Sequence, residues 1–193
     1  MRHTEHGAAL LALARQAIEQ AILPGQRDQA VSSQGDAAGK DQDGLQAWGA
    51  SFVTLTRNGH LRGCIGTTHP WRPLKEDVQA NAVAAALKDP RFTPLHAQEW
   101  PHTQVEVSVL SPLEPMVFDD EAQALAQLRP GVDGLVLTSG RYRATFLPQV
   151  WEQLPDPALF VTQLKRKAGL PAHFWSPDLS LQRFTVTKWK EPA

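Results

Sequence analysis

The dipeptide Asn58-Gly59 constrains the fold of this chain more than any other feature of its sequence. It separates two runs of strand-forming residues, Phe52–Thr56 and His60–Gly66. Asn-Gly is a preferred sequence for a two-residue hairpin turn, because both turn positions need a positive φ. The sequence therefore predicts two antiparallel strands joined by a tight turn.

The length of this turn also predicts the register of the hairpin. Two turn residues place Val53 opposite Cys64 and Leu55 opposite Arg62. Because side chains alternate across a strand, Arg62 and Cys64 are expected to share one face of the sheet.

The rest of the chain shows the patterns of helices and of further strands. An amphipathic helix is expected over 7–22, and another over 73–87 that begins at a proline. Asp156-Pro157 predicts the cap and first residue of a helix that ends near 168. Strands are expected over the ranges 104–110, 134–138, 142–147 and 181–189, the middle two as a hairpin.

Strands joined by hairpins and mixed with a few helices indicate an α+β fold with mainly antiparallel sheets and flanking helices. Residues 24–46 are rich in Gly, Gln, Asp and Ser and have scarcely an apolar side chain. Such a segment buries too little surface to offset its ordering cost, so an exposed, mobile loop is expected there.

Composition excludes several classes of protein. No apolar run approaches the roughly 18 residues of a membrane span, and the N-terminal segment is not patterned as a signal peptide. The formal net charge of -1 gives no overall positive field to attract nucleic acid. The single cysteine rules out an internal disulfide and a cysteine-cluster zinc site, and a cytoplasmic protein is expected.

Cys64 is the only soft nucleophile of the chain and the first candidate for a catalytic residue. A guanidinium at Arg62 on the same face would favour the reactive thiolate. Gly63 and Gly66 flank the cysteine, and two glycines so close together in a strand indicate a bulge or a backbone that something approaches closely. The alternative is a small buried side chain that packs against Val53.

Other candidates around Cys64 carry weaker signals. His69 lies just past the second strand, where it could serve as a general base for the thiol, although a surface histidine is the default interpretation. Glu106 and Ser108 form the polar face of the strand over 104–110, which borders a cleft or is simply solvated. The histidine spacings predict no metal site, and no phosphate-binding glycine loop or serine-hydrolase motif is present.

Several segments together resemble the signature of the AMMECR family. The hallmark LRGCIG is read here as Leu61–Gly66. Five further elements follow in family order: Asp89-Pro-Arg-Phe92 with Pro94-Leu95, Glu106-Val-Ser-Val-Leu-Ser111, Gly131-Val-Asp-Gly-Leu135, Phe146-Leu-Pro-Gln-Val-Trp151 and Lys167-Ala-Gly-Leu-Pro171. The resemblance covers one domain over residues 8–190. Some members have a cysteine where this chain has Lys165-Arg166, so a second thiol is not available here.

The resemblance implies two unequal lobes, the larger built from both chain ends, with a cleft between them. Arg62, Gly63 and Cys64 would line that cleft. The candidate substrate-binding residues are Gly63, Gly66, Thr67 and His69. It also implies a place in the AmmeMemoRadiSam system beside a MEMO-like protein and a radical-SAM protein. No reaction and no cofactor follow from it.

Two hypotheses therefore stand. In the first, the chain is an enzyme or enzyme-system subunit that modifies a small molecule or RNA-derived group in the interlobe cleft, with Cys64 as nucleophile or covalent carrier and Arg62 as its activator and anion clamp. Glu106 would then transfer protons or hold Arg62. In the second, the chain is a non-catalytic module that docks a MEMO-like or radical-SAM partner through the surface of Leu61–Thr67. RNA binding is a third possibility, which the net charge disfavours.

Overall fold

The computed structural model describes residues 2–23 and 42–192, which form two compact units. Unit 1 contains the chain up to Val109 together with the segment from Thr187 onward, and unit 2 runs from Leu110 to Val186. Each unit has one four-stranded sheet, so the predicted α+β class with mainly antiparallel sheets is confirmed. The cleft expected from the family resemblance stays a prediction.

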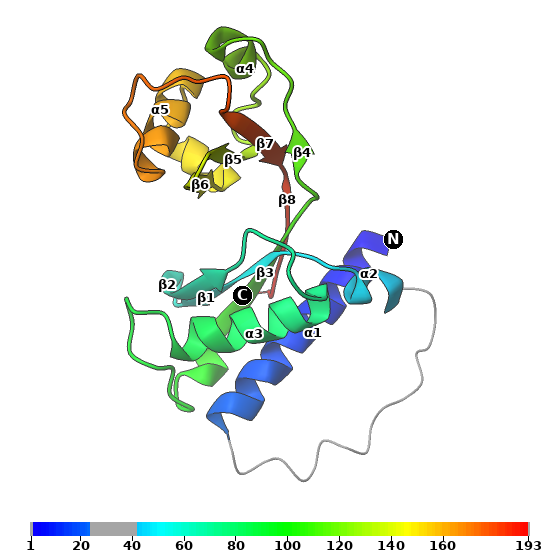
Figure 1. Ribbon diagram of the computed structural model, residues 1–193. Coiled ribbons are helices and arrows are strands. Elements are labelled where there is room, and N and C mark those ends of the chain that lie inside the picture. Colours follow the sequence, from blue (N-terminus) through cyan, green and yellow to red (C-terminus); the bar gives the residue numbers. More distant parts are fainter. Residues whose placement is uncertain (1, 24–41, 193) are drawn as a thin grey trace. The chain divides into compact units, whose positions relative to one another are not determined.

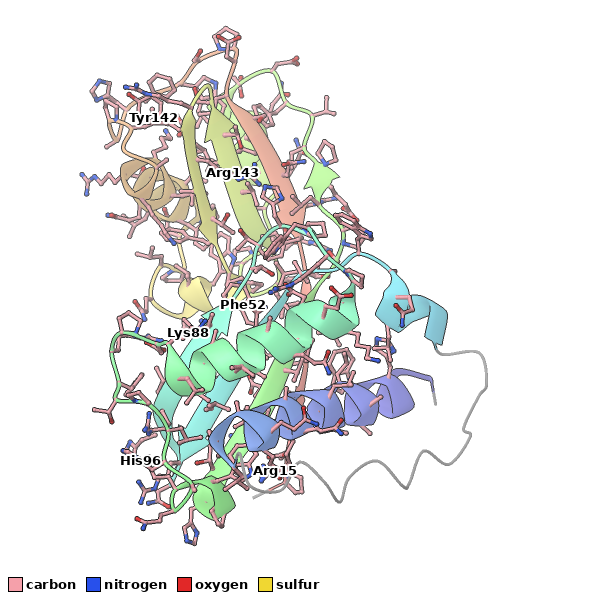
Figure 2. The ribbon with its side chains drawn as sticks, turned by 60° about the horizontal axis from the view of Figure 1, so that its bottom comes forward. Arg15, Phe52, Lys88, His96, Tyr142 and Arg143 are labelled. Carbon is pink, nitrogen blue, oxygen red and sulfur yellow. The ribbon has the colours of Figure 1, made fainter. Side chains whose placement is uncertain are left out.

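Unit 1 is built on a sheet with the strand order β2-β1-β3-β8. Its strands are β1 (Ser51–Arg57), β2 (His60–Gly66), β3 (Thr103–Leu110) and β8 (Val186–Lys190). Helices α1 (Arg2–Ile22) and α3 (Leu74–Leu87) pack side by side across one face of this sheet (Figures 1 and 2). The short helix α2 (Gln42–Gln46) contacts α3, and the 3₁₀ turn η1 (Trp100–His102) directly precedes β3.

The core of unit 1 explains why these elements form. The inward residues of β1 and β3 alternate with polar ones and pack against apolar stripes of both helices. Its fully buried members include Leu10, Ile18, Val53, Leu55, Val78, Val105 and Val107. Transfer of such side chains from water contributes about 1.5–3 kcal/mol each, which makes this face the stabilising side of the sheet.

Unit 2 has a sheet with the order β4-β7-β5-β6. Strands β5 (Gly134–Ser139) and β6 (Tyr142–Phe146) form the second predicted hairpin, and β4 (Glu114–Pro115) and β7 (Ser180–Phe184) complete the sheet. The remaining elements are α4 (Glu121–Ala126), η2 (Pro148–Glu152) and α5 (Pro157–Lys167). Asp156 caps α5 by accepting from the Leu159 amide at 2.8 Å, as the sequence predicts.

Three local predictions are wrong. The strand expected over 181–189 is two strands, because the chain leaves β7 in one sheet and enters β8 in the other around Thr185. The segment expected to be a loop over 24–46 contains α2, and its part over 24–41 lies outside the described residues. The register of the first hairpin is shifted, as described next.

A β-bulge changes the register between β1 and β2. Thr56 pairs with Leu61 and Leu55 with Gly63, so Arg62 is the extra residue of the bulge. Beyond the bulge Cys64 lies opposite Thr54, not opposite Val53. The glycine-rich sequence predicted a bulge, but the two-residue turn alone does not reveal its effect on the pairing.

Candidate functional site

Cys64 lies on the outer face of unit 1, the face of the sheet that points away from α1 and α3. In the observed register Thr54 faces Cys64 on one side and Glu106 on the other. Val53, Leu55, Val105 and Val107 occupy the opposite face, in the core. The three side chains Cys64, Thr54 and Glu106 therefore form a row across β2, β1 and β3, which we call the outer row.

The thiol of Cys64 contacts a hydroxyl within this row. Thr54 Oγ1 donates to Cys64 Sγ at 3.3 Å, and the cysteine is half-buried. This geometry disfavours the interpretation of Cys64 as a packing residue against Val53. A half-buried cysteine whose sulfur accepts from a hydroxyl is not packed among apolar side chains alone.

The backbone of Cys64 is fixed by the loop that follows α3. The amide N–H of Cys64 donates to Asp89 Oδ2 at 2.9 Å, and Arg91 Nη2 donates to the Cys64 carbonyl at 3.3 Å. Asp89 is almost fully buried and holds Arg91 through two bonds of 2.9 and 2.7 Å. These contacts pair the otherwise open edge of β2 and fix the position of the cysteine.

The charges of this loop stabilise one another. The hydrogen bonds from Arg91, followed by amide bonds from Cys64 and Arg91, hold the pKa of Asp89 well below its usual range in spite of burial. The pKa of Arg91 is raised, first by its bonds with Asp89 and also by attraction to Asp89 and Cys64. Arg91 is thus a cation at the backbone of Cys64, paired with Asp89, that residue patterns did not indicate. The only signal was its place in the motif Asp89-Pro-Arg-Phe92.

Arg62, which was expected to activate Cys64, is bound elsewhere. Its Nε and Nη2 donate to the two carboxylate oxygens of Glu99 at 3.0 and 2.9 Å. Nη2 also contacts the Pro94 carbonyl at 3.4 Å, and only 12% of the Arg62 side chain is exposed. The prediction that Glu106 holds Arg62 is wrong, because Glu99 does so. The bulge explains the difference, since it takes Arg62 out of the regular alternation.

Both glycines of the motif are explained by close contacts inside unit 1. A Cβ at Gly63 would lie 2.2 Å from the backbone oxygen of Ala85 in α3. A Cβ at Gly66 would lie 2.2 Å from Cγ of the Phe52 ring. The expected close approach is therefore made by α3 and by Phe52, without any ligand.

Thr67 is tied to a buried hydrogen-bond network at the start of α3. Its hydroxyl donates to Asp77 Oδ2 at 2.8 Å. Asp77 is fully buried and also accepts from Ser51, Arg72 and Asn81. This network joins the end of β2 to β1 and α3, which gives Thr67 a structural role. His69 is exposed and lies in the bend that follows β2.

The structure also bears on metals, cavities and membranes. Among the residues that it describes, no group of three or more His, Cys, Asp or Glu side chains could hold a metal ion. None of the helices over 2–23 and 42–192 is long and apolar enough to cross a membrane.

A surface hollow of about 580 Å³ at the β1–β2 turn does not include the outer row. It is lined by Arg15, Asn58, Gly59, Pro101, His102, Thr103, Gln104, Glu191 and Pro192.

Comparison with known proteins agrees with the motifs and the fold. The AMMECR1 family model matches residues 11–189. A protein of Aeropyrum pernix is 40% identical over 96% of this chain and 78% of its own length. A protein of Methanothermobacter thermautotrophicus is 36% identical over 97% of this chain and 95% of its own. The crystal structure of the uncharacterised protein PH0010 from Pyrococcus horikoshii superposes with a TM-score of 0.78 at 34% identity, and covers 97% of this chain and 92% of that one.

Proposed function

This chain belongs to the AMMECR1 family, and from that premise we propose that it is an enzyme, or a subunit of an enzyme system, with Cys64 as its reactive group. The substrate is a small molecule or an RNA-derived group that binds on the outer face of unit 1. Cys64 is the nucleophile or covalent carrier, Thr54 is its hydrogen-bond donor, and Arg91 takes the electrostatic role that was expected of Arg62.

The contact between Thr54 Oγ1 and Cys64 Sγ carries this proposal. A hydroxyl that donates to sulfur lowers the free energy of the thiolate, which is the nucleophilic form. The cation of Arg91 acts in the same direction, and the carboxylate of Asp89, which binds Arg91 and accepts from the Cys64 amide, offsets part of that effect. In a covalent step the thiolate forms a bond from sulfur to an electrophilic atom, and the group that leaves that atom carries away the electron pair.

Alkylation by iodoacetamide tests the reactive thiol. Sulfur forms a bond to carbon, iodide leaves, and because the chain has one cysteine the mass of the whole protein reports the reaction directly. We expect the folded protein to be labelled without unfolding, at a rate at least equal to that of a free peptide thiol under the same conditions. A cysteine that is labelled only after unfolding would overturn the proposal.

Thr54→Val is the sharper test, because it removes the hydroxyl and keeps the shape of the side chain. The lost hydrogen bond contributes about 0.5–1.5 kcal/mol net, so the alkylation rate at pH 7 should fall about twofold to tenfold. Thr56→Val is the matched control on the same strand and face, where the structure gives no bond to the thiol. Equal rates in all three proteins would show that Thr54 does not activate Cys64.

A second candidate function is docking of a MEMO-like or radical-SAM partner without catalysis. The observation that favours it is Leu61, a large apolar side chain on β2 that is 44% exposed. Leu159 on α5 is 43% exposed and provides a matched control in unit 2. If docking is the function, Leu61→Ser abolishes co-purification of the three proteins, while Leu159→Ser and Cys64→Ser leave it intact. If co-purification survives both Leu61→Ser and Leu159→Ser, the surface around Leu61 is excluded as the docking site.

A further inference from the structure

Strand β6 forms one edge of the sheet in unit 2, where it pairs with β5 alone (Figure 2). The hairpin closes with Ser139 opposite Tyr142 across a two-residue turn. In such a hairpin the closing pair exchanges both backbone hydrogen bonds, and every second residue after it does the same. The N–H and C=O groups of Arg143 and Thr145 therefore point away from β5, toward the open edge.

One contact shows that these outward groups are accessible from beyond the sheet. The Thr145 carbonyl accepts from Nζ of Lys167, at the end of α5, at 2.9 Å. The amides of Arg143 and Thr145 and the carbonyl of Arg143 have no partner within the part of the chain that the structure describes, and Arg143 is exposed. The edge is thus a row of backbone donors and acceptors that water or another extended chain can pair.

The elements beside this edge carry charges of one sign. No Asp or Glu occurs over 134–151 or 157–177, the stretches that contain β5, β6 and α5. Each of the other cations of unit 2 is paired with a carboxylate. The cations on these elements that form no ion pair with a described residue are Arg141, Arg143, Arg166 and Lys167. The edge is therefore basic, although the whole chain has a formal net charge of -1.

These cations flank both faces of the β6 edge. Ala144 and Phe146 face the core together with α5, so alternation places the Arg143 side chain on the opposite face. Lys167 lies on the α5 side, with its Nζ 5.1 Å from the centroid of the Phe146 ring. Cations on an edge strand repel basic strands and hinder unwanted pairing. The same cations attract an acidic strand, so they select the kind of chain that can pair here.

We propose that the open edge of β6 binds an extended acidic segment of another protein, which adds to the sheet of unit 2 as a further strand. The backbone of that segment pairs with Arg143 and with the Thr145 amide, and its Asp or Glu side chains meet the cations on either face. A nucleic acid would meet the charges but has no peptide backbone to continue the ladder. The edge uses unit 2 residues alone, so binding there is independent of the reactivity of Cys64.

Binding of synthetic peptides to the full chain tests this edge. The probe is a fluorescent peptide of about eight alternating Glu and Thr residues, within the length of an ordinary strand. Fluorescence anisotropy measures its dissociation constant, beside a Lys-Thr peptide and a Glu-Thr peptide in which every backbone amide is N-methylated. The Glu-Thr peptide should bind and the Lys-Thr peptide should not. N-methylation should weaken binding at least about tenfold, because it removes the backbone donors of the ladder.

Variants of the chain separate strand pairing from charge. Thr145→Pro removes an outward N–H that β5 does not use, so the hairpin keeps its own ladder, and Thr145→Ala is the matched control that keeps this N–H. Arg143→Gln removes one charge at the edge, whereas Lys75→Gln removes one from an exposed position on α3 in unit 1. Binding of the Glu-Thr peptide should weaken at least about tenfold in Thr145→Pro and about threefold in Arg143→Gln, and stay unchanged in both controls.

Three results would overturn this inference. Peptide binding that survives both Thr145→Pro and N-methylation would show attraction by charge alone, without an added strand. A thymidine oligonucleotide that binds more tightly than the Glu-Thr peptide would identify a nucleic-acid surface instead. Absence of peptide binding to the wild-type chain would remove the docking site and leave the reactive thiol standing, because alkylation of Cys64 is measured separately.

Discussion

The carboxylate of Glu99 holds the guanidinium of Arg62 through two hydrogen bonds, of 3.0 Å to Nε and 2.9 Å to Nη2. Arg57 Nη1 and the amide of His96 donate to the same carboxylate at 2.9 and 3.0 Å. These donors favour the ionised form, Arg62 first, and they lower the pKa of Glu99 from 4.5 to about 2. Glu99 therefore links the bulge of β2 to the end of β1 and to the loop before β3.

Glu99→Gln should destabilise the protein by about 2 kcal/mol at neutral pH. Because the pKa of Glu99 is lower in the folded state, its contribution is fully present above about pH 4.5 and is lost as the pH falls toward 2. Urea unfolding of the variant and the wild type from pH 7 to pH 3 checks this. A difference in free energy of unfolding that stays constant below pH 4.5 would contradict it.

Gly63→Ala should destabilise unit 1 by about 2–3 kcal/mol, because the new methyl group would meet the Ala85 carbonyl and force α3 away from the sheet. Gly140→Ala is the control: its φ of +55° strains an alanine, but nothing lies within 4 Å of the new Cβ. That strain is worth about 1–2 kcal/mol. Thermal and denaturant unfolding of both variants measure the difference, and a Gly63→Ala protein as stable as wild type would refute the close contact.

Asp77→Asn should cost about 3 kcal/mol or more. Asp77 Oδ2 accepts from four donors and Oδ1 from Arg72 Nε, so an amide would turn its NH2 toward donors and leave buried groups unpaired. Glu76→Gln, one residue earlier and exposed, should change stability by less than about 0.5 kcal/mol. Similar denaturation midpoints for the two variants would rule out the network as a source of stability.

The ion pair of Lys165 and Glu121 in unit 2 should respond unequally to loss of each partner. Lys165 is 1% exposed and donates to Glu121 Oε1 at 2.6 Å and to the Ala172 carbonyl at 3.3 Å, whereas the Glu121 side chain is 38% exposed. Glu121→Ala leaves a buried ammonium without its carboxylate, at a cost of about 3 kcal/mol. Lys165→Met leaves a hydrated carboxylate and should cost less than half of that. Equal losses in chemical denaturation would contradict this asymmetry.

Local sequence patterns predicted most of the elements of this fold. Asn-Gly placed the first hairpin, and Asn58 and Gly59 have the positive φ values, 51° and 77°, that such a turn requires. The proline before α3 and the Asp156 cap of α5 set the starts of two helices. These signals work because turn, cap and alternation depend only on residues near in sequence. The ranges of α3, β3, β5 and β6 match within a residue or two.

Local residue patterns were enough to predict the α+β class, the two hairpins and the position of Cys64 on a strand between two glycines. Which groups surround that cysteine depends on how the elements pack in three dimensions. The bulge at Arg62 depends on packing of Gly63 against α3, and it moved Thr54 opposite the thiol. Glu99, Asp89 and Arg91 come from a loop more than 20 residues away, and β8 pairs with β3 although most of unit 2 lies between them in the sequence. Such contacts follow from how the elements pack together, and no local pattern of residues carries them.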